Sequence, residues 1–168
     1  MAVDSPQARP RQARPIGISL APVPYFWSRQ ALEDFYRAAV DWPVDTVYLG
    51  ETVCGKRRAL RLGEWIELGE ALAENGKEVV LSSQILIEAD SEVATLERVC
   101  DNGRFSVEAN DMGAVHRLAG RIPFVAGPHL NIYNAPALSV TAQSGAYRWV
   151  PPVELPASTL AALLGARP

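Results

Sequence analysis

The sequence predicts an α/β fold made of parallel βα units. From Ile16 onward, short apolar runs of strand character alternate six times with longer amphipathic segments, and this pattern is typical of a parallel sheet with crossover helices. Six units could form an open doubly wound sheet or part of a barrel, which normally has eight. No Gly-x-Gly-x-x-Gly fingerprint follows the first run, so a nucleotide-binding Rossmann domain is the weaker alternative.

The six apolar runs are short enough to be strands, and glycine, proline or asparagine separates most of them from the next segment. We expect strands over Ile16 to Ala21, Asp45 to Leu49, Glu78 to Ser82, Phe105 to Glu108, Pro123 to Ala126 and Tyr147 to Val150.

Helices are predicted between these runs from apolar spacing and capping residues. Ser28, Asp90, Asp111 and Asn134 are the expected N-caps of four helices, because their side chains can accept from free backbone N–H groups. The helix that carries Leu62, Trp65, Ile66 and Leu72 should stop at Asn75-Gly76, and a last helix should run from about Pro156 to Leu164.

The composition bounds the class of protein. The chain has 168 residues, 48% of them hydrophobic, which suits one domain with a sizeable core. Residues 1–15 contain arginines and prolines but no aromatic residue, so we expect a disordered tail before a domain at 16–168. A net charge of −3 argues against a general nucleic-acid binder. Without a transmembrane run or a signal peptide, we expect a cytoplasmic protein.

The tract from Tyr48 to Arg58 places Cys54 and three cations directly after an apolar run. Neighbouring cations favour the thiolate, the form of cysteine that attacks electrophiles and binds metals. Packing as a small buried hydrophobe is an equally good interpretation. Cys100, at the end of a helical pattern, is interpreted as a core residue.

Other polar residues also follow the predicted strands. In a parallel α/β fold, functional groups gather beyond the carboxyl ends of the strands. The candidates there are Glu51, Glu108, His129 and Asn131. We expect Cys54 to share one cavity with Glu108 and His129, and Glu51 and Glu108 are a possible acid-base pair.

Several motifs together resemble the UbiV branch of the collagenase-like peptidase family U-32. The resemblance runs from about Ile16 to Leu160 and includes Tyr25-Phe26-Trp27, Tyr48-Leu49-Gly50-Glu51 with Cys54, Val107-Glu108-Ala109, Pro123-Phe124-Val125-Ala126-Gly127 with Asn131, and Arg148-Trp149. It implies a TIM-barrel-like fold, present here as an incomplete barrel.

The resemblance also implies a function. Members of this branch hold a four-iron iron-sulfur cluster on four cysteines and work with a partner, UbiU, as a heterodimer in the oxygen-independent hydroxylation of a ubiquinone precursor. Cys54 matches the first of the four cysteines, and the other three lie in a C-terminal part of the family. We therefore expect a truncated form that does not hold a stable cluster alone. The alternatives are a U-32-type peptidase or hydrolase, and a non-catalytic remnant or binding module.

Overall fold

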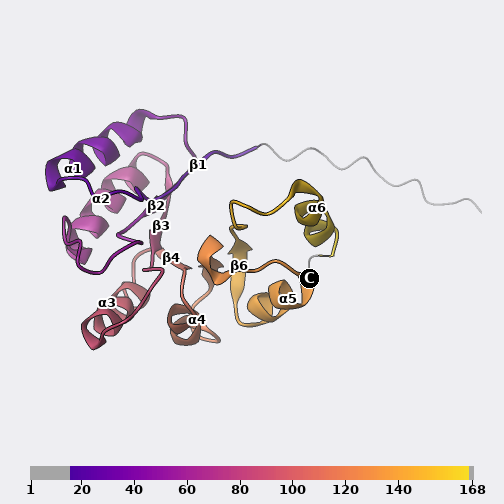
Figure 1. The fold of residues 1–168 in the computed structure, drawn as a ribbon. Helices are drawn as coiled ribbons and strands as arrows, with labels where there is room; N and C mark the ends of the chain where they lie inside the picture. Colours follow the sequence, from indigo (N-terminus) through magenta and orange to yellow (C-terminus); the bar gives the residue numbers. More distant parts are fainter. Residues whose placement is uncertain (1–15, 167–168) are drawn as a thin grey trace, which may run out of the picture.

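A computed structural model gives the fold of residues 16–166, and the tail predicted at 1–15 lies outside them. Six parallel strands lie in sequence order in one sheet, and the sheet curls into a half-barrel with α1 to α5 along its outer side (Figure 1). The strands are β1 (Ser19–Leu20), β2 (Thr46–Leu49), β3 (Glu78–Ser82), β4 (Ser106–Ala109), β5 (Phe124–Ala126) and β6 (Ala146–Trp149). The helices are α1 (Arg29–Ala38), α2 (Leu62–Glu74), α3 (Asp90–Cys100), α4 (Met112–Leu118), α5 (Ala135–Gln143) and α6 (Ala157–Gly165). This confirms the predicted incomplete barrel of parallel βα units.

The first strand is much shorter than predicted. Only Ser19 and Leu20 pair with β2, whereas Ile16 is 96% exposed. Ile18 is instead tied to Asp45, whose carboxylate accepts from its N–H at 2.6 Å. As an edge strand, β1 has a partner on one side only, so little burial favours extending it. The third strand matches its predicted range at both ends.

Three of the four predicted N-caps are present. Ser28 Oγ accepts from the N–H of Ala31, Asp111 Oδ1 from that of Gly113, and Asn134 Oδ1 from that of Ala137. The prediction for Asp90 is wrong by one residue. Ala89 is the N-cap of α3, because the carboxylate of Glu92 accepts from the N–H of Ala89 and of Glu88 at 3.1 and 2.7 Å. A carboxylate at the third helical position thus replaces a capping side chain at Ala89.

The two faces of the sheet differ in what they bury. Alternate residues of β2 and β3 pack under α1 and α2, and a second cluster lies under α3 and α4; these residues include Val47, Leu49, Val79, Leu81, Val107 and Phe124. The other face carries Tyr48, Val80 and Val125, packed with Val150. Because successive side chains of a strand alternate between faces, Glu108 on β4 belongs to this inner face, opposite Val107. No helix within residues 16–166 has both the length and the apolar character needed to cross a membrane.

Candidate functional site

All five candidate residues lie at or near the carboxyl-end edge of the half-barrel. Glu51 and Cys54 follow β2, and Glu108 lies within β4, two residues before the loop to α4. His129 is in the 3-10 turn Pro128–Leu130 after β5, and Asn131 ends that turn. The parallel order of the strands brings these segments to the same edge, as predicted.

The Cys54 loop is held by Glu51. One carboxylate oxygen of Glu51, Oε1, accepts from the N–H groups of Val53 and Cys54 at 3.0 and 3.2 Å. The carbonyl of Cys54 in turn accepts from the N–H of Arg57 at 3.0 Å, and the Arg57 guanidinium lies 4.0 Å from the same Glu51 oxygen. Cys54 is half-buried and is the first residue of this tight turn. Glu51 therefore positions the cysteine.

The start of the loop approaches β3 closely at Gly50. Its φ of +143° is a conformation that side chains rarely adopt, and a Cβ there would lie 2.6 Å from the carbonyl oxygen of Ser82. The carbonyl of Thr52 accepts from the N–H of Ile85 at 2.8 Å, which ties the loop to the segment after β3. These contacts fix the position of the turn that carries Cys54.

Glu108 lies in a buried network on the inner face. Its side chain is 4% exposed, and its Oε2 accepts from Ser82 Oγ at 2.6 Å and from Asn110 Nδ2 at 3.0 Å. The N–H of Asn110 donates to Ser83 Oγ at 2.9 Å. The network joins the ends of β3 and β4, and within residues 16–166 Asn110 Oδ1 is its one buried oxygen without a hydrogen-bond partner. Glu51 and Glu108 have separate hydrogen-bond partners, so nothing here links them as an acid-base pair.

His129 and Asn131 lie in an exposed loop. Asn131 adopts a left-handed conformation, with φ 56° and ψ 46°, which asparagine tolerates better than most residues. Two residues on, the hydroxyl of Tyr133 donates to Glu154 in the segment before α6. This hydrogen bond, with a smaller contribution from a backbone hydrogen bond, lowers the pKa of Glu154. The loop after β5 thus rests against the segment after β6.

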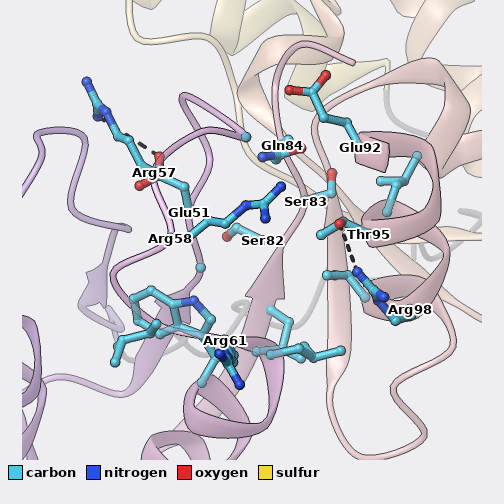
Figure 2. A pocket seen from close by; sticks show the side chains of 18 of the residues that line it. Glu51, Arg57, Arg58, Arg61, Ser82, Ser83, Gln84, Glu92, Thr95 and Arg98 are labelled. Atoms are coloured by element: carbon cyan, nitrogen blue, oxygen red, sulfur yellow. Dashed lines mark hydrogen bonds and ion pairs between the residues drawn. The ribbon is translucent and has the colours of Figure 1, made fainter. Parts of the chain in front are cut away.

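A cavity with a volume of about 780 Å³ lies between α2 and α3, next to the ends of β2 and β3 (Figure 2). Glu51 lines it, but Cys54, Glu108, His129 and Asn131 do not. A smaller cavity beside α4 and α5 is not lined by them either. Neither of these two cavities brings Cys54, Glu108 and His129 together, so the cavity predicted to hold all three stays a prediction. Glu108 points to the inner face of the sheet, whereas the larger cavity lies on the face covered by helices.

Besides Glu51, the cavity is lined by polar residues that were not candidates from the sequence. Arg61 stands at the start of α2, and Thr95 and Arg98 lie on α3. Neither arginine follows a strand directly, so the rule that functional groups gather at strand ends does not predict them. These residues meet at the cavity only because α2 and α3 face each other across it. The sequence alone does not give that packing.

The residues of 16–166 do not fit a four-iron cluster. Within that range no group of three or more His, Cys, Asp or Glu side chains is placed to hold a metal ion. Such a cluster takes four thiolates. Cys100 is 2% exposed in the core under α3 and α4, and burial raises the pKa of its thiol to about 11, so it is an unsuitable ligand there. Cys54 is then the one cysteine of residues 16–166 left to bind a metal.

Comparison with known protein families identifies the family to which the chain is related. The profile of peptidase family U32 matches residues 31–166. The matched range runs from α1 to α6 and contains the Cys54 loop, the Glu108 network and the cavity between α2 and α3. Since the match covers most of the chain and all but the first strand of the half-barrel, the protein belongs to peptidase family U32.

Proposed function

We propose that this chain is a UbiV-type accessory component that works with UbiU, in the cytoplasm, in the oxygen-independent hydroxylation of a ubiquinone precursor. One observation carries the proposal: the turn that presents Cys54 is built for a fixed cysteine at the carboxyl-end edge. The Glu51 carboxylate accepts from the Cys54 N–H, and Gly50 lets the backbone pass Ser82. Both contacts hold the backbone of the turn, so the thiol of Cys54 is presented from a fixed position.

The proposal gives residues 16–166 a limited part in any iron-sulfur cluster. Cys54 offers one thiolate of the four that such a cluster requires, so other ligands must come from another segment or from a partner. Anaerobic reconstitution with iron and sulfide tests this part. The 168-residue chain alone should hold no stoichiometric cluster. A stable cluster on the isolated chain would contradict the ligand count.

The function itself is tested by complementation. A bacterial strain that lacks its own UbiV but retains UbiU, grown without oxygen, should regain ubiquinone when it expresses this chain, and Cys54→Ser should abolish the gain. Cys100→Ala is the matched control, because Cys100 is buried away from the loop. Ubiquinone content is measured by liquid chromatography. Equal ubiquinone in the Cys54→Ser strain, or none with the unmodified chain, would refute the proposal.

A peptidase or hydrolase is the main alternative, and no contact within residues 16–166 favours it. Nucleophilic hydrolysis needs an accessible hydroxyl or thiol beside a base. Ser82 does bond to a carboxylate, that of Glu108, but both are 4% exposed. Gelatin cleavage that is lost on alkylation of Cys54 would favour the peptidase. Absence of both cleavage and complementation would leave a binding module.

A further inference from the structure

The cavity between α2 and α3 has an unusual set of arginines. Residues 16–166 contain ten arginines, and seven of them form an ion pair with a carboxylate of the same range. The three that do not are Arg58, Arg61 and Arg98, and all three line this cavity. The guanidinium groups of residues 16–166 that lack an ion pair within that range are therefore collected in one place, in a chain of net charge −3.

The carboxylates that line the same cavity are already engaged. Glu51 accepts from the N–H groups of Val53 and Cys54. Glu92 accepts from those of Glu88 and Ala89 at the start of α3. Four arginines line the cavity against two glutamates, a net charge of +2. Since neither glutamate forms an ion pair with Arg58, Arg61 or Arg98, the cavity keeps a positive charge that a ligand can neutralise.

The arginines come from both walls. Arg58 reaches from the Cys54 loop across the cavity toward Ser82, Ser83 and Gln84, while Arg98 lies on the opposite wall on α3 (Figure 2). Thr95 Oγ1 accepts from Arg98 Nη2 at 3.0 Å, which orients that guanidinium. Arg57, by contrast, is turned toward Glu51. Guanidinium groups on two sides of a gap suit a small anion bound between them.

Further features point to a ligand with an apolar body. The buried side chains of Leu49, Leu60, Trp65, Leu81 and Leu96 line the cavity, and its volume of about 780 Å³ lies within the usual range of small-molecule sites. At the strand ends, Gln84 has a buried side-chain oxygen without a hydrogen-bond partner in the described part of the chain. A donor on the ligand would satisfy it.

We infer that this cavity binds a small organic anion, a carboxylate or phosphate carried on an apolar or aromatic body, between Arg58, Arg61 and Arg98. The inference goes beyond the proposed function, since Cys54 does not line the cavity. The oxyanion pairs with guanidinium groups, and the body of the ligand lies on the leucine and tryptophan side chains.

The test is a titration of the full chain followed by two-dimensional amide NMR. The probes are benzoate, phenyl phosphate, inorganic phosphate and neutral benzamide. Benzoate or phenyl phosphate should bind saturably, shift the side-chain amide signals of Gln84 and the indole signal of Trp65, and bind more weakly as salt is raised. Benzamide should not bind. The tighter binder of benzoate and phenyl phosphate identifies the oxyanion that the cavity prefers. Comparison of phenyl phosphate with inorganic phosphate shows whether the apolar body contributes to binding.

Variants separate the cavity from the rest of the surface. Arg58→Gln and Arg98→Gln should each weaken binding by about tenfold or more, the effect expected when a charge-assisted hydrogen bond is lost. Arg104→Gln is the matched control, because Arg104 pairs with Glu70 outside the cavity. Cys54→Ser should bind as well as the unmodified chain, so the outcome does not depend on the proposed function. Equal affinity of both cavity variants and the control, or no saturable binding by any anion, would overturn the inference.

Discussion

Arg148 on β6 and Glu78 on β3 form an ion pair across the inner face of the half-barrel, with Nη2 2.9 Å from Oε1. The strands β4 and β5 lie between them in the sheet. In a flat sheet, three strand spacings would separate the two backbones by roughly 14 Å. The curl of the sheet brings the two side chains close enough to form the pair. Glu78 also accepts from Thr46 Oγ1 at 2.8 Å, so the contact connects β2, β3 and β6.

Removing this pair should destabilise the protein moderately. Partial burial acts to lower the pKa of Arg148. The hydrogen bonds and charges of Tyr48 and Glu78 have the larger effect, so the pKa lies above its ordinary value. Because both side chains are more than one third exposed, the coupling should be only about 0.5–1 kcal/mol. A double-mutant cycle of Glu78→Gln and Arg148→Met, read by urea denaturation, measures it. Zero coupling in low salt would show that the pair does not brace the curled sheet.

The two cysteines should differ sharply in reactivity. Cys54 is half-buried at the start of a surface turn, whereas Cys100 is 2% exposed and burial raises the pKa of its thiol to about 11. At pH 8 a thiol reagent such as dithionitrobenzoate should therefore modify one cysteine in the folded chain and two after denaturation. Cys54→Ser should remove the native reaction, and Cys100→Ala should keep it. Rapid modification of both thiols in the folded chain would contradict the packing of Cys100.

The fold could be predicted from sequence further than the site could. Alternating apolar runs reflect burial, so they located all six strands, and Glu78 to Ser82 was correct at both ends. Side-chain direction was harder to predict. Glu108 and the cavity lie near the same edge but on opposite faces of the sheet, a difference that one residue of register decides. The cluster of Arg58, Arg61 and Arg98 depends on the packing of α2 beside α3, which no local pattern encodes.

Acid should weaken a surface ion pair between α3 and α4. The Arg117 guanidinium donates to Asp101 and lowers the pKa of that carboxyl below its ordinary value of 3.8. A lowered folded-state pKa means that the stabilisation is fully present above about pH 5. It is lost as the pH falls through 3.8 toward the lower folded-state value. Asp101→Asn should therefore be less stable than the unmodified chain at pH 7, and the difference should shrink near pH 3.

Thermal unfolding at a series of pH values measures this difference. Asp41→Asn is the matched control, because Asp41 is exposed and forms no ion pair within residues 16–166. Its difference from the unmodified chain should not follow the same pH course. High salt should reduce the Asp101 effect, since the pair is exposed. A difference for Asp101→Asn that stays constant from pH 7 to pH 3 would show that the ion pair does not stabilise the fold.

The buried network at Glu108 should depend on a glycine from the neighbouring strand end. A Cβ at Gly127 would lie 2.1 Å from Asn110 Oδ1 and 2.9 Å from the carbonyl oxygen of Ala109. Both are buried, and the second belongs to the backbone, so neither can move away freely. Gly127→Ala should push Asn110 out of place, break its 3.0 Å hydrogen bond to Glu108, and cost about 1–3 kcal/mol, as overpacking does.

The matched control is Gly63→Ala in α2, where an added Cβ meets nothing within 4 Å. That change should be neutral or stabilising by up to about 1 kcal/mol, because alanine favours helix more than glycine does. Urea denaturation compares the two variants. Asn110→Ala in the Gly127→Ala background should recover part of the loss by making room for the methyl group. If Gly127→Ala unfolds at the same urea concentration as the unmodified chain, the Asn110 side chain is not held against Gly127, and the Glu108 network is looser than its hydrogen bonds indicate.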